Sequence, residues 1–209
     1  MKWFLIMLLL FSMPQVYGKS RRRVVNELGF DFNYSKQVYG SVRQNSVRKR
    51  TYSGSYALYF LSTTALELNY SYGEEVTTEN HDLQIEDTDY SIIGFQNVVE
   101  SEVFGIGIRQ AFAGPKSRLK PMISLGYAKQ FIKDKSTITL RNNTNGAVTT
   151  VNNGSSQKRT DSVFGSFALQ FRLMGSFFLK GSVKTVFPAF KTNLAKDYLT
   201  YSAGFSWMF

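Results

Sequence analysis

The chain has 209 residues, with 25 Lys and Arg against 15 Asp and Glu, and a formal net charge of +10, which indicates anionic partners. It has no cysteine, which excludes disulfide bonds and a bacterial lipid anchor on Cys. Its aromatic content of 15% and its four prolines favour strands.

The N-terminus has the pattern of a secretory signal peptide. Lys2 precedes an apolar run over residues 3–13, and Val16, Tyr17 and Gly18 form a cleavage pattern. We therefore expect a signal peptide over 1–18 and a single barrel domain over 19–209. The run is too short to span a bilayer, which takes about 20 apolar residues. Because no other stretch is long enough as a helix, a membrane protein made from this chain has to cross as strands that close into a barrel.

Alternating apolar and small polar residues predict the strands. About 190 mature residues, at roughly 20 to 25 per strand and loop, give about eight of them. They are expected over residues 28–34, 52–60, 66–73, 104–112, 123–128, 166–173, 177–184 and 199–209. The start of the fourth stays open, because residues 90–100 either extend the sheet or belong to a loop. The predicted fold is all-β, an eight-stranded antiparallel transmembrane up-and-down β-barrel with its apolar side chains toward lipid.

The connections alternate in length. Short or moderate ones are predicted at 62–64, 113–120 and near Gly175, and long ones at 40–50, 74–89, 133–158 and 188–196. Short turns are typical of the periplasmic side, so both termini are expected there. Residues 139–156 carry turn signals at Asn145-Gly146 and Asn153-Gly154. They form either a protruding hairpin whose edge adds a partner strand or a flexible loop.

The signal peptide, the eight strands and the aromatic C-terminal residues 201–209 together resemble the OmpX/OmpA-type small outer-membrane β-barrels. The resemblance implies a bacterial outer-membrane location, export through the periplasm, and contact with periplasmic chaperones and the barrel-assembly machinery. It also implies that Tyr201, Phe205, Trp207 and Phe209 form an assembly signal. The alternative is that Phe209 only ends a strand within the aromatic girdle.

Charged residues on the polar faces predict an interior ion network of Glu27, Asp31, Glu67, Arg109, Arg172 and Lys180. The expected pairs are Glu67 with Arg109, Glu27 with Arg172, and Asp31 with Lys180. An eight-stranded barrel is just wide enough for side chains to fill it, so we expect a plugged interior. The network either holds the strands in register or acts as the gate of a small ion pore.

Basic residues gather in the predicted outer loops: Arg43, Arg48, Lys49, Arg50, Lys158 and Arg159. They either contact lipopolysaccharide phosphates or are solvated loop charges, and nucleic acid is not an expected partner. The loop over 74–89 holds seven of the acids and either neutralises the basic loops or binds divalent cations, although it matches no calcium-loop template.

Catalytic motifs are absent from the sequence, and its one histidine, His81, lies in the acidic loop. We expect no catalytic residues, cofactor or metal. The sequence favours a monomeric barrel with a structural role or a role in contacting a surface ligand. The alternatives are a small gated ion pore, a lipid A- or phospholipid-modifying enzyme, and a soluble lipocalin-like carrier whose apolar faces would point inward.

Overall fold

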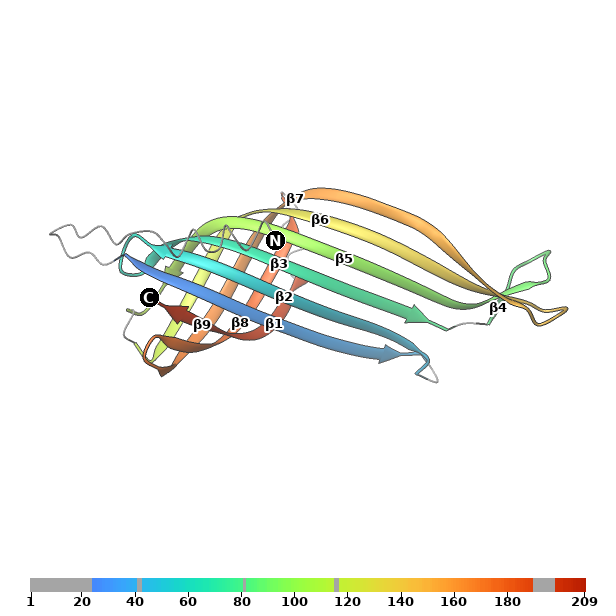
Figure 1. Cartoon of the computed structure of the whole chain (residues 1–209), viewed down its shortest axis with the longest axis horizontal. Coiled ribbons are helices and arrows are strands. Elements are labelled where there is room, and N and C mark those ends of the chain that lie inside the picture. The colour runs from blue at the N-terminus through green and yellow to red at the C-terminus, as the bar shows by residue number, and fades with distance from the viewer. Residues whose placement is uncertain (1–23, 41–42, 81, 115–116, 190–197) are drawn as a thin grey trace, which may run out of the picture.

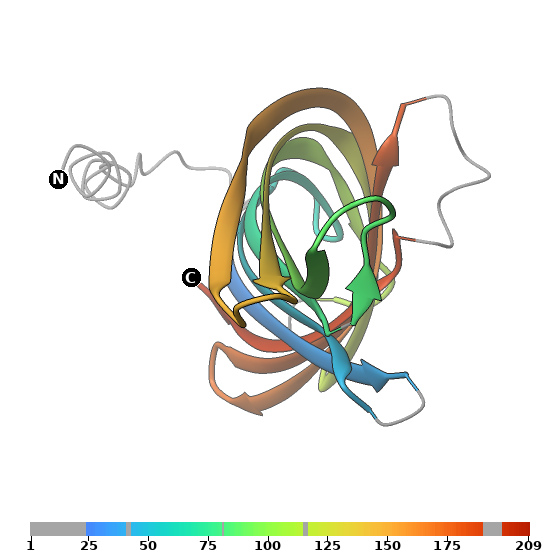
Figure 2. The ribbon, with the colours of Figure 1, turned by 90° about the vertical axis from the view of Figure 1, so that its right-hand side faces the viewer.

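The computed structural model describes residues 24–40, 43–80, 82–114, 117–189 and 198–209. These residues form nine strands: β1 (Val25–Tyr39), β2 (Asn45–Tyr59), β3 (Thr64–Glu79), β4 (Leu83–Gln84), β5 (Tyr90–Ala111), β6 (Leu119–Asn142), β7 (Val148–Met174), β8 (Phe177–Pro188) and β9 (Thr200–Met208). All except β4 belong to one closed barrel (Figures 1 and 2). No helix in the described part of the chain is long and apolar enough to cross a membrane.

Every barrel strand pairs antiparallel with its neighbours. The order is β3-β2-β1-β9-β8-β7-β6-β5, and a further pairing of β3 with β5 closes the ring. The first and last strands pair from Glu27 opposite Met208 to Phe32 opposite Ala203. The prediction of an eight-stranded antiparallel barrel is therefore confirmed.

The outer surface of the barrel is apolar. Successive side chains of a strand point to opposite faces, so each alternating strand turns its large apolar residues outward. These side chains are 40–62% exposed: Phe30, Phe32, Leu66, Leu68, Phe104, Ile106, Ile108, Leu125, Phe167, Leu169, Phe171, Leu179, Phe205 and Trp207. A belt of this size is far larger than the exposed apolar patches of soluble monomers.

Both described termini lie at one end of the barrel, which we call the terminal end. There the backbones of Asn26 and Phe209 exchange two hydrogen bonds of 2.9 Å. The short connections after β2 and β7 lie at the same end, and Gly175 turns the chain with a φ of 53°. The predicted signal peptide over 1–18 lies outside the described residues.

At the other end, here called the distal end, the strands are longer than predicted. β5, β6 and β7 have 22, 24 and 27 residues and project well beyond the rest of the barrel (Figure 1). Most of residues 40–50, 74–89 and 133–158, predicted as long loops, is therefore strand, and β5 begins at Tyr90. Alternation misses these parts because polar side chains lie on both faces of the projecting sheet, as at Asn152 and Asn153 of β7.

The tip of the β6–β7 hairpin turns at Asn145-Gly146, where Gly146 has a φ of 73°. The prediction of a second turn at Asn153-Gly154 is wrong. It lies inside β7 at a bulge, where Lys135 pairs with Ser155 and the next residue of β6, Ser136, pairs with Asn153. Gly154 supplies the extra residue of the bulge.

The predicted acidic loop is tied to this hairpin. The Arg141 guanidinium donates to both carboxylate oxygens of Asp82 at 2.9 Å, and the Asn143 backbone N–H donates to the Asp89 carbonyl at 2.7 Å. At the end of β3, the Tyr39 hydroxyl donates to Glu79 at 2.7 Å, and this hydrogen bond raises the pKa of the tyrosine. The acidic residues of this region thus contact groups on β1 and β6.

Two glycines make room for an aromatic ring inside the barrel. Gly107 and Gly126 face each other across β5 and β6, and a Cβ on Gly126 would lie 2.5 Å from the Phe164 ring. Phe164 fills this space and packs with Val103 and Ala128. The glycine pair therefore sets how deeply Phe164 enters the lumen.

Candidate functional site

The candidate site is the buried ion network, which follows from cross-strand register. Glu27 lies opposite Ala57 on β2, and Ala57 lies opposite Glu67 on β3, so both acids share one row of the inner face. The small Ala57 side chain leaves the lumen open between them. Two residues beyond this row on β5, Arg109 reaches both acids, with Nη1 2.7 Å from Glu27 and Nε 2.9 Å from Glu67.

Glu27 is the centre of the network. Its Oε1 accepts hydrogen bonds from Arg109 and, at 2.6 Å, from the Gln170 amide. Its Oε2 accepts from Lys120 at 3.1 Å and from the Tyr59 hydroxyl at 2.9 Å. All five side chains are buried. A buried carboxylate is stable when it is paired and hydrogen-bonded in this way.

Lys120, Tyr59 and Gln170 were absent from the predicted network. The sequence pattern predicts Lys120 in the connection over 113–120, whereas the structure places it in β6. The signal that would have found it is present in the sequence, because the inward alternation of Ser124 and Met122 continues back to Lys120. All three belong to the inner face of their strands.

Of the predicted pairs, the structure brings together Glu67 with Arg109 and, at 2.8 Å, Asp31 with Lys180. The predicted pairing of Glu27 with Arg172 is wrong, because Glu27 binds Arg109 and Lys120 instead. The Arg172 guanidinium lies 5.2 Å from the centre of the Phe178 ring. Alternation placed Arg172 on the correct face but did not give its distance from Glu27 across the lumen.

An apolar cluster lies beside the network toward the terminal end. Its largest members are Tyr59, Met122, Phe178 and Met208, packed with four small alanines. The ammonium nitrogen of Lys120 lies 5.2 Å from the centre of the Tyr59 ring and 5.3 Å from that of Phe178. The lumen therefore contains a charged layer backed by an apolar one.

The predicted basic contacts separate into different faces. Arg48 and Arg50 lie on the outer face of β2, with Arg50 5.9 Å from the Tyr34 ring, whereas Lys49 points inward and lies 3.9 Å from Glu75. On β7, the alternation places Lys158 on the inner face and Arg159 on the outer one, 5.5 Å from the Phe131 ring. Arg43 lies in the turn between β1 and β2, with a φ of 57°.

All four predicted assembly residues lie on the outer surface, with Phe205, Trp207 and Phe209 toward the terminal end and Tyr201 at the start of β9. The Phe205 ring lies 5.6 Å from Phe30 and 5.7 Å from Phe177, and Trp207 lies 5.1 Å from Phe209. Tyr201 is 65% exposed on the same face. Strand pairing thus continues the apolar belt across the β1–β9 junction.

His81 lies outside the described residues. Among the described residues, no three His, Cys, Asp or Glu side chains form a group that could hold a metal ion.

Comparison of the sequence with protein-family models and with curated proteins gives no match. Among solved structures, the chain is similar to the N-terminal β-barrel domain of Pseudomonas aeruginosa OprF, with 16% identity, coverage of 89% of this chain and 97% of that chain, and a TM-score of 0.48. It is also similar to Ail, the attachment invasion locus protein of Yersinia pestis, with 12% identity, coverage of 89% and 97%, and a TM-score of 0.44. For Neisserial surface protein A these values are 8%, 88%, 94% and 0.35. The closed eight-stranded pairing is itself the architecture that the resemblance to OmpX/OmpA-type barrels implied.

Proposed function

We propose that the chain is an integral protein of a bacterial outer membrane, with a closed polar interior and a structural or surface-interaction role. The observation that carries the proposal is the inversion of the two faces. Large apolar side chains cover the outside, whereas Glu27, Glu67, Arg109, Lys120 and Lys180 are buried inside. A soluble carrier requires the opposite arrangement. A closed barrel also leaves no unpaired strand edge within the bilayer.

The interior supports a role in holding the strands. Arg109 joins β5 to β1 and β3, and Lys120 joins β6 to β1. Glu27 also accepts from Gln170 on β7, which in turn donates to Ser206 on β9 at 2.8 Å. With Tyr59 of β2, which also donates to Glu27, one network thus connects seven strands across the lumen. The proposal assigns it to fixing the strands in register, without a catalytic role.

Surface contact is the second part of the proposal. The projecting β5–β7 sheet and the outward basic residues favour contact with lipopolysaccharide and with an extracellular ligand. Export through the periplasm, periplasmic chaperones and the barrel-assembly machinery follow from the proposed location.

Conductance in planar bilayers separates a closed barrel from a small pore. We expect the purified protein to insert without sustained conductance steps, because the charged layer and the apolar cluster fill the lumen. Stable steps in the unmodified protein that grow in Glu67→Gln would contradict the closed interior and favour the gated pore. Glu102→Gln, on the outer face, is the matched control because it removes the same charge outside the lumen.

A further inference from the structure

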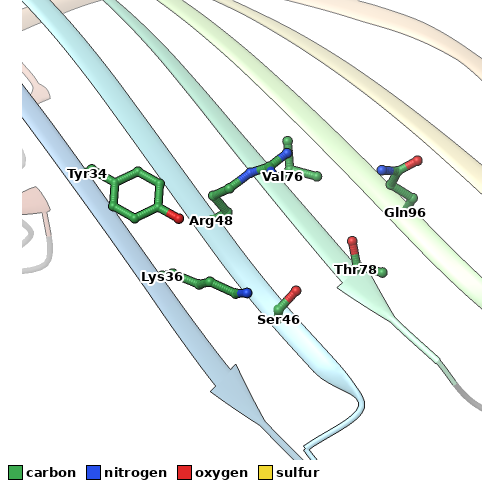
Figure 3. Close-up of a pocket in the computed structure, with 7 residues that line it drawn as sticks. All are labelled: Tyr34, Lys36, Ser46, Arg48, Val76, Thr78 and Gln96. Atoms are coloured by element: carbon green, nitrogen blue, oxygen red, sulfur yellow. The ribbon is translucent and has the colours of Figure 1, made fainter.

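A small hollow lies on the outer wall near the distal ends of β1, β2, β3 and β5 (Figure 3). Its volume is about 170 Å³. It is lined by Tyr34, Lys36, Ser46, Arg48, Val76, Thr78 and Gln96. Apart from Tyr34, five of these residues have side chains that can donate a hydrogen bond: two are cationic, two are hydroxyls and one is an amide. No lining residue carries a carboxylate.

Cross-strand register builds this site. Lys36 lies opposite Arg48, and Thr78 lies opposite both Ser46 and Gln96. All five share the strand face of the apolar belt, so they point away from the lumen. In Figure 3, the Lys36 amino group extends toward Ser46, and the Arg48 side chain crosses toward Val76. Four strands therefore bring two cations and three neutral donors to one place.

The two cations of the hollow have no ion-pair partner among the described residues. By contrast, Lys49 on the opposite face of β2 has an ion-pair partner, because Glu75 lies 3.9 Å from it. In addition, the Arg48 Nε atom is buried and makes no hydrogen bond in the described structure. A buried donor without an acceptor is unfavourable, so an anion that supplies oxygen atoms would stabilise this arrangement.

The position along the strands points to a lipid headgroup. Phe32 and Tyr52 lie side by side on the wall here, with ring centres 5.1 Å apart, and Tyr34 is a further exposed aromatic residue of β1 at the edge of the hollow. Lys36 and Arg48 lie four residues further along their strands, which is about 13 Å at 3.3 Å per residue. Strands of such barrels tilt by roughly 35–45°, so the cations lie about 10 Å above the rings, where lipid phosphates follow the acyl chains.

We infer that this hollow binds a phosphate monoester of the lipid A headgroup of lipopolysaccharide. Arg48 and Lys36 supply the charged donors, and the hydroxyls of Ser46 and Thr78 with the Gln96 amide supply the neutral ones. Guanidinium groups suit this ligand because their N–H donors match two phosphate oxygens. The inference rests on the proposed outer-membrane location. It adds Lys36 to the predicted contacts and removes the inward-facing Lys49 and Lys158.

Binding of lipid A to the full protein in phosphatidylcholine nanodiscs tests the inference. The comparison uses bisphosphorylated lipid A and the same lipid with both phosphates removed, and it measures the thermal shift of unfolding as lipid A is increased. Only the phosphorylated lipid should stabilise the unmodified protein. Lys36→Gln/Arg48→Gln should weaken apparent binding by about tenfold or more, because two charged hydrogen-bond donors are lost.

Two further variants make the test specific. Lys49→Gln/Lys158→Gln removes the same charge from inward positions and should bind as the unmodified protein does. Lys36→Arg/Arg48→Lys keeps both charges and should retain most of the binding, which also shows that the site tolerates substitution. Equal weakening in the inward and outward double variants would overturn the inference.

The source of the phosphate is tested in the same system. An equal shift with phosphatidylglycerol would identify a general response to anionic lipid, and an equal shift with inorganic phosphate in detergent would identify a free anion. Either result overturns the assignment to lipid A. Failure of the proposed function looks different, because then no variant, including the controls, inserts into nanodiscs.

Discussion

The carboxylate of Glu27 on β1 lies 3.1 Å from the ammonium nitrogen of Lys120, which follows it by 93 residues in sequence. Both side chains are buried, with 0% and 1% of their surface exposed. This contact crosses the lumen and reaches strands that are not neighbours in the sheet. It therefore opposes any slippage of β1 relative to β6.

Replacing Glu27 with Gln should destabilise the barrel strongly. The change leaves Lys120 without its carboxylate partner and Arg109 with only Glu67, and breaking a buried ion pair costs about 3–5 kcal/mol. The free energy of unfolding can be measured in urea from Trp207 fluorescence. Glu102→Gln, exposed on the outer face, is the control and should change stability by less than about 1 kcal/mol.

A second substitution shows whether the stranded cation causes this loss. Lys120→Met in the Glu27→Gln background should recover part of the stability, because Lys120 lies near Tyr59, Met208 and Phe178 and an apolar side chain suits them. A further loss of stability in the double variant would contradict the role assigned to Lys120.

Gly126→Ala should destabilise the barrel by about 1–3 kcal/mol, the usual cost of overpacking. Its new Cβ would clash with the Ile106 carbonyl oxygen and would lie 2.5 Å from the Phe164 ring, so the β5–β6 pairing or the ring would have to move. Gly181→Ala is the matched control, because a Cβ there has no heavy atom within 4 Å. Equal unfolding midpoints for both variants would contradict the tight packing of Gly126 against β5 and Phe164.

Phe209→Ala tests the predicted assembly signal. If the terminal aromatic is read during biogenesis, the variant should reach the outer membrane at a lower level while its stability after refolding in detergent changes little. Phe171→Ala removes an aromatic ring of similar exposure, 48% against 46%, from another part of the belt. If both variants reach the membrane equally, Phe209 only belongs to the girdle.

The sequence predicted faces better than it predicted depth or length. Alternation placed Glu67 and Arg109 on the inner faces of adjacent strands, and neighbours in a sheet have little choice of partner. It could not choose a partner for Glu27, because contacts across a lumen depend on the stagger of strands that are far apart in the ring. The sequence therefore predicts Arg172 as the partner of Glu27, whereas Arg109 and Lys120 bind this carboxylate in the structure.

The alternation of apolar and polar residues also did not predict where the strands end. Alternation marks a strand only where one face meets lipid and the other the lumen. Residues such as Lys135 and Gln157 lie in a part of the sheet that has polar side chains on both faces, so nothing in the pattern separates them from a loop. At the terminal end, the predicted strand begins at Ile123, whereas β6 begins at Leu119 and includes Lys120.

Labelling from within the bilayer tests the central claim most directly. A photoactivatable reagent confined to the acyl phase of vesicles should modify Leu68, Ile106 and Leu169, which are 41–50% exposed on the outer face. It should spare the inward-facing Glu67, Arg109 and Gln170 of the same strands, and peptide mapping by mass spectrometry distinguishes the two sets. Preferential labelling of the charged and amide set would contradict a barrel that turns its apolar face to lipid.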